Sequence, residues 1–389
     1  MTVHGHPHLD VFLTVGKDRA GKDRAEIICW GPVGLLKNQN LAQTTAQVAE
    51  LGGTERAARV LHRLVMKDGL EELPEAPPRD TAKKFWTEVR HQFEVPNLTL
   101  VERRMSAYDG FTKYLFTSGG DLFEAVRIPL LHRVGKEKYV VCISSQVGCN
   151  AGCAFCATGK MGFRRNLEVW EMIDQLVQVS RDSAYPIRGV VFMGMGEPML
   201  NYSRVMTAAQ LMSDSNGLAI DSKAITVSTV GVVPGIKRFT KAGFSIKLIL
   251  SLHSAIPDRR KRLVPMAELY DLDSLYQAMR EYHEATGRRV PLAWTLLKGI
   301  NTGTDELHAL AQWRRDLPIV LDLIPVNDDS GEFEAPEKAE VDRFLDGYTK
   351  IVRQPFIMRY SGGKDIAGAC GMLATHNCGG TRRNPELSL

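Results

Sequence analysis

From Tyr139 onward the chain repeats one pattern, in which a short apolar stretch typical of a β-strand is followed by the spacing of an amphipathic helix. The predicted strands cover residues 139–144, 189–193, 224–228, 245–250, 292–297, 319–324 and 356–360. One of the helices between them has apolar residues at i, i+3, i+4 and i+7 spacing, namely Val169, Met172, Ile173, Leu176 and Val179. Strands that alternate with helices of this length pair in parallel. The sequence therefore predicts an α/β fold, a full or partial β/α barrel, with its chemistry at the carboxyl ends of the strands.

Motifs rich in glycine and polar residues follow five of these strands. They are residues 149–156 after the first strand, 194–198 after the second, 228–231 after the third, 251–253 after the fourth and 325–327 after the sixth. Taken alone, a Gly-x-Gly-Glu motif is often an ordinary turn and a single histidine is usually structural. The carboxyl ends of parallel strands meet at one edge of a sheet, so the convergence of all five motifs predicts a single site there.

Cys149, Cys153 and Cys156 form a C-x3-C-x2-C triplet. Three thiolates this close in sequence suit three corners of an iron–sulfur cubane, and they leave the fourth iron open to another ligand. The alternative is a zinc knuckle completed by Cys142 or by a distant histidine, although structural zinc sites usually consist of two separated pairs. The triplet therefore favours a [4Fe–4S] cluster.

Composition narrows the cellular setting. The seven cysteines, at positions 29, 142, 149, 153, 156, 370 and 378, are odd in number and irregularly spaced, which argues against a secreted disulfide framework. No apolar run approaches the roughly 18 residues that cross a bilayer, and the amino terminus does not resemble a signal peptide. We therefore expect a cytoplasmic protein without membrane attachment. The net charge of +4 permits a polyanionic partner but does not by itself indicate one.

Five segments are expected along the chain. Residues 1–40 form an amino-terminal extension with weak strand character, and residues 41–97 form a small helical accessory domain broken by a proline-rich stretch. Residues 98–138 carry alternating segments and turn signals that predict a β-hairpin connection. The barrel covers residues 139–373, and residues 374–389 form a carboxyl-terminal tail.

Five blocks of the sequence carry a specific resemblance, namely 141–149 (VCISSQVGC), 156–167 (CATGKMGFRRNL), 194–198 (GMGEP), 251–253 (SLH) and 365–371 (DIAGACG). On these blocks, the chain resembles the RlmN/Cfr family of radical SAM methyltransferases between about residues 56 and 373. Enzymes of this family methylate an adenosine base in large-subunit ribosomal RNA, and RlmN-type members also act on transfer RNA. The resemblance implies that Cys149, Cys153 and Cys156 hold a [4Fe–4S] cluster whose open iron binds S-adenosylmethionine. It also implies a set of residues that contact this cofactor, namely Gly196, Glu197, Ser228, Ser251, Leu252, His253 and Asn327.

The same resemblance assigns three catalytic residues. Cys370 matches the cysteine that the family methylates, Cys142 matches its disulfide partner, and Glu124 matches a proposed base. This assignment is chemically sensible because an adenine ring carbon is a poor nucleophile toward a sulfonium methyl group, whereas a thiolate is a strong one. A second thiol can free the linked base by forming a disulfide. Glycines on both sides of Cys370 predict a segment that lets this thiol change position, and Cys378 is either an incidental tail thiol or a competing resolving thiol.

The resemblance implies methylation of C2 of an adenosine in 23S rRNA, with tRNA as a further substrate. Methylation of C8 of the same kind of base, a radical SAM methylase of a non-RNA substrate, and a non-enzymatic metal-binding RNA module are the alternatives. Basic residues at the expected barrel mouth could bind RNA phosphates, or could be solvated surface charges: Arg164, Arg165, the run 259–262, and the pair Arg382 and Arg383. We also expect an electron donor such as flavodoxin or ferredoxin, and a monomeric protein.

Overall fold

The computed structural model of the chain describes residues 10–17, 23–30, 34–79, 81–131, 134–328 and 330–374. Cys378 and the pair Arg382 and Arg383 lie outside these residues, as does the side chain of Cys29. The chain forms two compact units. The smaller unit comprises residues 1–97, 168–182 and 207–220, and the larger unit comprises residues 98–167, 183–206 and 221–389.

The smaller unit is mainly helical. It begins with an antiparallel hairpin of β1 (Asp10–Lys17) and β2 (Asp23–Trp30). Its other elements are β3 (Gly34–Leu35), η1 (Leu36–Asn38), α1 (Leu41–Glu50), α2 (Glu55–Met66), α3 (Lys83–Gln92), β4 (Phe93–Glu94), α5 (Val169–Arg181) and the end of α6 (Tyr202–Ser213). Asn40 and Gln43 form a capping box at the start of α1, and Thr54 caps α2 by accepting the backbone N–H of Ala57.

A buried ion pair joins two segments of the smaller unit that lie far apart in sequence. Lys37 Nζ lies 2.5 Å from Asp174 Oδ1, and both side chains are 1% exposed. The same ammonium donates to the carbonyl oxygen of Pro96 at 2.8 Å. Burial lowers the pKa of Lys37, and the charge of Asp174 opposes that shift. The helix α5 is therefore fixed to the amino-terminal segment by a charge that would be costly to leave unpaired.

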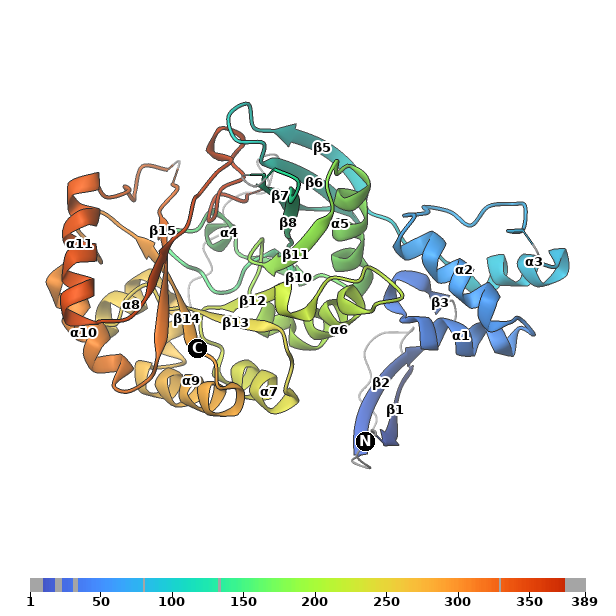
Figure 1. Cartoon of the computed structure of the whole chain (residues 1–389), viewed down its shortest axis with the longest axis horizontal. Coiled ribbons are helices and arrows are strands. Elements are labelled where there is room, and N and C mark those ends of the chain that lie inside the picture. Colours follow the sequence, from blue (N-terminus) through green and yellow to red (C-terminus); the bar gives the residue numbers. More distant parts are fainter. Residues whose placement is uncertain are drawn as a thin grey trace. The chain divides into compact units, whose positions relative to one another are not determined.

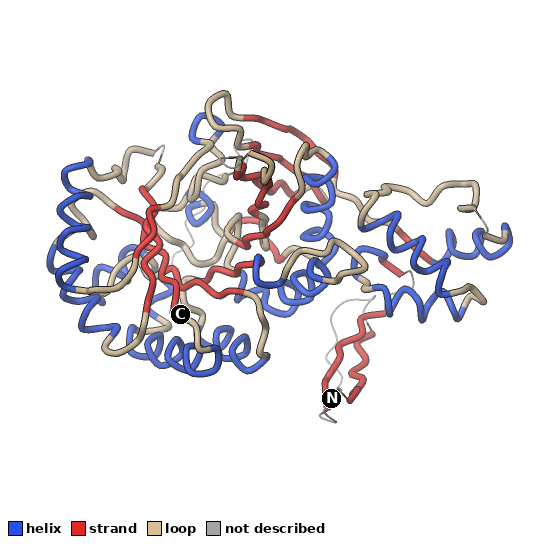
Figure 2. Tube along the Cα trace, in the orientation of Figure 1, coloured by secondary structure: helices blue, strands red, loops and turns tan. Residues whose placement is uncertain are grey.

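The larger unit is built on one ten-stranded sheet in the order β16-β15-β14-β13-β12-β11-β8-β7-β6-β5. The strands from β8 to β16 are parallel, and they are β8 (Lys138–Cys142), β11 (Ile187–Phe192), β12 (Ile225–Thr229), β13 (Lys247–Ser251), β14 (Val290–Leu296), β15 (Ile319–Pro325) and β16 (Phe356–Met358). They curve into an open barrel wall, with α7 (Val233–Ala242), α9 (Leu272–Thr286), α10 (Thr304–Arg314) and α11 (Lys338–Ile351) outside it (Figures 1 and 2). All seven strands predicted from the sequence are present, and the barrel is a partial one.

Alternating side chains give the barrel wall two apolar faces. Leu248 and Leu250 of β13, like Leu292 and Trp294 of β14, are fully buried, as the helix-facing side of such a wall requires. On the opposite face Ile249, Ala293 and Ile324 form a smaller cluster, against which Met193 packs. The polar residues at the strand ends therefore lie next to a compact cluster of apolar side chains.

The segment 98–138 differs from the predicted hairpin connection. It contains three strands, β5 (Thr99–Met105), β6 (Thr112–Ser118) and β7 (Asp121–Leu130), which form an antiparallel extension of the main sheet through the pairing of β7 with β8. Turn residues mark strand ends in a sequence but do not reveal which distant strand each one pairs with. The remaining elements of the larger unit are short, and they are β9 (Gln146–Gly148), α4 (Ala157–Lys160), β10 (Phe163–Asn166), η2 (Pro198–Asn201), η3 (Ser222–Ala224), α8 (Pro257–Leu263), η4 (Pro265–Glu268) and η5 (Lys364–Ile366).

Candidate active site

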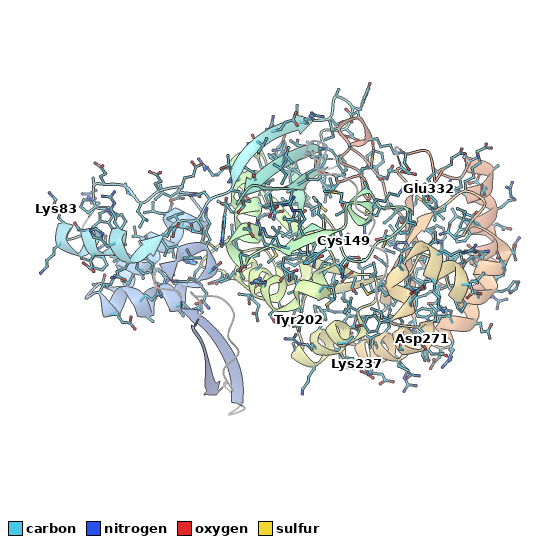
Figure 3. The ribbon with its side chains drawn as sticks, turned by 180° about the vertical axis from the view of Figure 1, so that it is seen from behind. Lys83, Cys149, Tyr202, Lys237, Asp271 and Glu332 are labelled. Atoms are coloured by element: carbon cyan, nitrogen blue, oxygen red, sulfur yellow. The ribbon has the colours of Figure 1, made fainter. Side chains whose placement is uncertain are left out.

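The cysteine triplet occupies the loop between β9 and α4. Cys149 lies deep in the larger unit (Figure 3), where it exposes 9% of its surface, and Cys153 exposes 8%. The N–H of Ala151 donates to Cys149 Sγ at 3.4 Å, and the N–H of Cys156 donates to the carbonyl of Cys153 at 3.1 Å. The loop thus turns its backbone donors inward, toward its own sulfur and oxygen atoms.

Apolar side chains surround this loop. They include Phe155, Leu263, Val264, Met266, Leu297 and Val326. Burial raises the pKa of Cys149 to about 12 and places that of Cys153 well above its ordinary value. These thiols hold their protons at neutral pH in the absence of a ligand, so any metal group that binds here must displace protons.

Glu197 is fixed by backbone groups from two neighbouring strand ends. Its carboxylate accepts the N–H of Met199 at 3.0 Å and the N–H of Val230 at 2.9 Å. Its own N–H donates to Gln146 Oε1 at 2.8 Å. Burial raises the pKa of Glu197 to about 7, and the hydrogen bond from Val230 opposes this shift. The predicted cofactor residue therefore also braces the ends of β11 and β12.

Gly196 allows Glu197 to take this position. Its φ of +106° is rarely adopted by residues with a side chain, and a Cβ at this position would lie 2.6 Å from Gln146 Cβ. The close approach of the glycine to Gln146 brings the Gly-Met-Gly-Glu loop against β9. This is a structural reason for the second glycine of the motif.

A polar row crosses the strand ends at the inner face of the barrel. Ser228 Oγ and Ser251 Oγ lie 3.0 Å apart, and both residues are partly exposed. Asn327 is buried, and its Nδ2 donates to Ser361 Oγ at 2.7 Å and to the carbonyl oxygen of Cys370 at 3.2 Å. Asn327 Oδ1 receives no hydrogen bond from the described part of the protein. The row therefore offers two hydroxyls and one unused buried acceptor.

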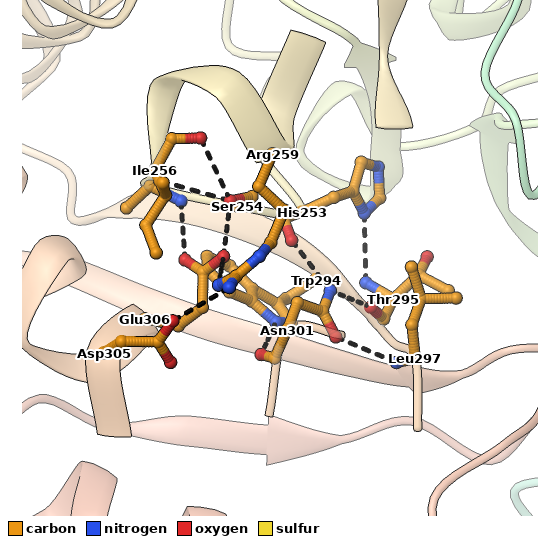
Figure 4. Close-up of polar contacts among 11 residues, drawn as sticks. His253, Ser254, Ile256, Arg259, Trp294, Thr295, Leu297, Asn301, Asp305 and Glu306 are labelled. Carbon is orange, nitrogen blue, oxygen red and sulfur yellow. Dashed lines mark hydrogen bonds and ion pairs between the residues drawn. The ribbon is translucent and has the colours of Figure 1, made fainter. Parts of the chain in front are cut away.

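His253 has an unusual backbone conformation, with φ +59° in a non-glycine residue. Figure 4 shows its Nδ1 accepting the N–H of Thr295 at 3.0 Å, while its carbonyl accepts Asn301 Nδ2 at 2.8 Å. Its ring stands edge-on to that of Phe155 with centroids 4.7 Å apart. Burial lowers the pKa of His253 to about 3, so the ring is neutral and carries its proton on Nε2. Its neighbour Leu252 is fully buried, and the contact with Phe155 places His253 against the cysteine loop.

The acidic residue beneath this histidine holds the start of α8. Glu306 is buried and accepts Ser254 Oγ, the N–H of Ala255 at 2.9 Å and Arg259 NH1 at 2.8 Å (Figure 4). Arg259 also pairs with Asp305 at 2.8 Å. The Arg259 guanidinium is therefore engaged in ion pairs with Asp305 and Glu306 within the protein.

Arg260 is fully buried, so it is neither a phosphate-binding cation nor a solvated surface charge, the two alternatives left open for the basic run. Its guanidinium donates to the carbonyls of Val230 at 2.6 Å, Ser251 at 3.2 Å and Leu252. Both alternatives fail because Arg260 lies on the helix face that also carries Leu263, and that face packs inward. Lys261 and Arg262 remain exposed.

Arg164 and Arg165 form ion pairs with the same acidic residue. They lie 2.9 Å and 2.7 Å from the carboxylate of Asp121. The Arg164 side chain is nevertheless 65% exposed. It therefore remains accessible to a partner, whereas Arg165 is more enclosed.

The three predicted catalytic residues lie in the larger unit. Cys142 is buried at the end of β8, and Cys370 is exposed in the segment after β16. The five described cysteines 142, 149, 153, 156 and 370 are free thiols. Burial and the charge of Cys370 raise the pKa of Cys142 to about 12, while a backbone hydrogen bond from Met193 and the charge of Arg359 oppose this shift. Ionisation of Cys370 therefore disfavours ionisation of Cys142.

Glu124 stands on the same sheet face as Cys142. Glu124 of β7 pairs with Leu115 of β6, and Val126 of β7 pairs with Cys142 of β8. Glu124 and Val126 are two residues apart on one strand, so Glu124 and Cys142 lie on the same face of the sheet. Lys113 Nζ lies 3.0 Å from Glu124 Oε1, and both side chains are buried. The structure thus brings the predicted base and the predicted resolving thiol to the same wall.

Comparison with known proteins places this site in a family. The model of the Radical SAM superfamily matches residues 143–313. A protein of Myxococcus xanthus named "Probable RNA methyltransferase" is 41% identical over 89% of this chain and 96% of its own length. A "Probable dual-specificity RNA methyltransferase RlmN" of Thermus thermophilus is 37% identical over 82% of this chain and 88% of its own length. The crystal structure of a radical SAM methyltransferase from Sphaerobacter thermophilus has a TM-score of 0.79 and 32% identity, covering 87% of this chain and 99% of that one.

The chain belongs to the RlmN-type family of radical SAM RNA methyltransferases. Its cofactors are therefore a [4Fe–4S] cluster and S-adenosylmethionine. The residues of this RlmN-type chain fit both groups, because the triplet offers soft sulfur donors in an apolar setting and Asn327 Oδ1 is an acceptor open to a ligand hydroxyl.

Among the described residues, no three His, Cys, Asp or Glu side chains are grouped to hold a single metal ion. Within the same residues, none of the helices has the length and apolar character to span a membrane.

Sequence reasoning missed Asp322 and Arg359. Arg359 Nε donates to Asp322 Oδ1 at 3.2 Å, a second contact joins the same two groups, and Arg359 NH1 donates to Met193 Sδ at 3.4 Å. The charges of Cys142 and Cys370, the two predicted catalytic thiols, act on this guanidinium. A signal for the pair was available, because an acid and a base interrupt two otherwise apolar predicted strands that are neighbours in the sheet.

Proposed function

We propose that this enzyme methylates C2 of an adenosine in 23S rRNA, with tRNA as a second substrate, through an S-methyl group carried on Cys370. The observation that carries the proposal is the position of two free thiols, Cys142 and Cys370, around Arg359 beside the cysteine-triplet loop. The N–H of Ala157, next to Cys156, donates to the carbonyl of Gly371 at 2.8 Å. The names of the RlmN relatives support RNA as the substrate.

Cys149, Cys153 and Cys156 would hold the cluster. The polar row of Ser228, Ser251 and Asn327 would bind S-adenosylmethionine, together with Gly196, Glu197, Leu252 and His253. When bound, these cofactors supply a transferable methyl group and a 5′-deoxyadenosyl radical. The expected protein partner is an electron donor such as flavodoxin or ferredoxin, and the enzyme acts as a cytoplasmic monomer.

Cys370 receives the methyl group as a thiolate, which is a much better nucleophile than an adenine carbon. Burial among surrounding atoms raises the pKa of Cys370, and the Arg359 guanidinium lowers it. The residue as a whole is nevertheless exposed to solvent. Arg359 therefore favours the reactive form of a thiol that a large substrate can reach.

Release of the product uses the other two residues. Once the base is linked through a methylene group to Cys370 Sγ, Glu124 takes the proton from the ring carbon. Cys142 then attacks Cys370 Sγ, which forms a disulfide and breaks the bond from sulfur to the methylene carbon. That carbon takes a proton and becomes the methyl group of the product.

The test is the intact mass of wild-type protein and of Cys142→Ala, both produced anaerobically and treated with nuclease. Cys142→Ala should retain a methylene-linked nucleotide on Cys370, because it lacks the resolving thiol. A Cys142→Ala, Cys370→Ala double variant is the matched control and should carry no adduct. Absence of any modification from all three proteins would overturn the relay.

Product analysis addresses the position of the methyl group. Digestion of RNA treated with the wild-type enzyme should give 2-methyladenosine. Formation of 8-methyladenosine would replace the C2 assignment and leave the relay intact, whereas unmodified RNA with a methylated Cys370 would redirect the search to another substrate.

A further inference from the structure

A cavity of about 660 Å³ opens beside the segment that leads from β16 to Cys370. Its walls come mainly from two segments far apart in sequence, the β5–β6 turn and residues 358–365, and Pro325 at the end of β15 completes them. These two segments lie side by side at the top of Figure 1. The N–H of Ala107 donates to Asp365 Oδ2 at 3.1 Å, and the N–H of Gly363 donates to Asp109 Oδ2 at 2.9 Å. The cavity is therefore framed by an ordered pair of loops.

The two acidic residues that line the cavity, Asp109 and Asp365, accept the hydrogen bonds that join the two loops. Besides Gly363, Asp109 accepts the N–H of Phe111 at 3.2 Å and the phenol of Tyr360 at 3.1 Å. Partial burial would raise the pKa of Asp109, but the hydrogen bond from Gly363 and its other donors lower it overall. Asp109 thus keeps its negative charge, and its carboxylate and that of Asp365 are held by donors from the two loops.

Lys364 supplies positive charge at the same place. It is exposed, it lines this cavity and also a second cavity of about 470 Å³ next to Asn327, and it has no ion-pair partner among the described residues. Arg359 lines the first cavity as well, but its guanidinium is paired with Asp322. The ammonium of Lys364 is therefore the group of this cavity that suits a phosphate.

Two tyrosine rings stand open to solvent at the rim. Tyr108 is 87% exposed and Tyr360 is 71% exposed. The phenol of Tyr360 is held by Asp109, and its ring is edge-on to Phe111 with centroids 6.2 Å apart. This arrangement fixes the ring of Tyr360 while leaving much of its surface free. Exposed aromatic rings beside cations are the usual platform for unpaired bases.

The cavity also leads toward the catalytic thiols. Arg359, which lines it, interacts with the charges of both Cys142 and Cys370. Ser361, another lining residue, accepts the Asn327 amide, which also donates to the carbonyl of Cys370. A nucleotide held at the rim would therefore be a neighbour of any base that reaches Cys370.

We propose that Tyr108, Tyr360 and Lys364 form a subsite for an unpaired nucleotide next to the target adenosine in RNA, with its base on the tyrosine rings and its phosphate on Lys364. This inference rests on the proposed function for the identity of the target. Stacking tolerates any base because every base has a π-face. The subsite therefore requires unpaired RNA but does not select a flanking sequence.

The test uses a short RNA hairpin whose unpaired loop carries one 2-aminopurine, a base whose fluorescence falls when it stacks. The wild-type enzyme should quench this fluorescence, and Tyr108→Leu and Tyr360→Leu should each bind roughly tenfold more weakly and quench less. Tyr360→Phe keeps the ring and should quench like the wild type. In Lys364→Met, the salt dependence of log affinity should fall by about 0.7. Tyr185→Leu is the matched control, because Tyr185 is 40% exposed but precedes β11, at the opposite strand end.

Equal affinity and quenching by the wild type and both leucine variants, or equal competition by a blunt duplex without a loop, would overturn the subsite. Thermal unfolding midpoints confirm that the variants are folded. Formation of methyladenosine by the wild type is scored separately. Quenching that depends on the tyrosines without methyladenosine would support the subsite and overturn the proposed function, whereas methyladenosine without such quenching would do the reverse.

Discussion

At the scale of single residues, buried polar side chains hold the strand ends that carry the site. Arg260 joins three carbonyls at the ends of β12 and β13, and Glu197 joins the backbone after β11 to the backbone after β12. Hydrogen bonds within a strand ladder cannot fix these ends, because the ladder stops there. Each of these two junctions between strands and loops thus depends on a single side chain.

Replacement of Arg260 by methionine should destabilise the enzyme strongly. Three buried carbonyls would lose their donor, and we expect the free energy of unfolding to fall by about 3 kcal/mol. Urea unfolding under anaerobic conditions measures this change. The neighbouring exposed residue provides a control, and Lys261→Met should change the same free energy by less than about 0.5 kcal/mol. Similar losses in both variants would rule out the assigned role.

Glu197 should make stability depend on pH. Its pKa in the folded protein is raised by burial from 4.5 to about 7, so the folded state binds the proton more tightly than the unfolded state does. The associated stability is present below pH 4.5 and is lost as the pH rises to about 7, a decrease of about 3 kcal/mol. Glu197→Gln cannot titrate. The difference in unfolding free energy between the wild type and this variant should therefore fall across that interval, and a constant difference would contradict the prediction.

Arg359 should control the reactivity of Cys370. Its charge lowers the pKa of the thiol, so removal of the charge raises the pKa and reduces the thiolate fraction at a given pH. Arg359→Met, placed in a Cys149→Ala background to keep Cys370 unmethylated, should alkylate several-fold more slowly at Cys370 with iodoacetamide. The pH midpoint of the reaction should rise. Arg359→Lys keeps a charge, so its alkylation rate should lie between those of the parent protein and Arg359→Met. Unchanged rates would remove Arg359 from the mechanism.

At the scale of elements, the strands and the helices between them could be predicted because hydrophobic spacing is a local property. The antiparallel extension by β5, β6 and β7 could not, because pairing with β8 depends on residues outside the segment. The same distinction holds at the site. The cysteine triplet was readable from its spacing, whereas the burial of Arg260 and the pairing of Arg359 with Asp322 depend on which helix and strand faces pack inward. Arg260 and Leu263 are three residues apart, a spacing that puts both on one helix face. This spacing, within the basic run, was the signal that Arg260 is buried.

The contact between the β5–β6 turn and the Cys370 segment should depend on Asp109. This carboxylate binds two backbone N–H groups and one phenol, so Asp109→Ala should loosen the segment. We expect hydrogen exchange at the Gly363 amide to accelerate by roughly tenfold, as for the loss of about 1.4 kcal/mol of local stability. Amides in β14 report on the rest of the fold and should not change. Exchange that accelerates equally in both places would indicate global destabilisation instead.

At the scale of the whole molecule, the smaller unit includes residues 168–182 and 207–220 from the middle of the chain. The predicted boundary near residue 97 is therefore not a place at which the chain can be cut cleanly. A chain beginning at Leu98 would lack Lys37, and the buried ion pair between Lys37 and Asp174 would be lost. It should aggregate on expression, as judged by gel filtration. Full-length Lys37→Met is the comparison, with an expected loss of about 3 kcal/mol in unfolding free energy. A monodisperse, cooperatively folding truncated chain would disprove this view of the smaller unit.

Three hydrogen bonds hold the segment around Cys370 in place. The N–H of Ala157 donates to the carbonyl of Gly371 at 2.8 Å, Asn327 Nδ2 donates to the carbonyl of Cys370 at 3.2 Å, and Thr158 Oγ1 donates to the carbonyl of Leu373. A typical hydrogen bond contributes about 1 kcal/mol net. Release of this segment therefore costs about 3 kcal/mol, far less than unfolding of the barrel. For the proposed carrier thiol, these bonds would act as a weak latch that resets its position between turnovers.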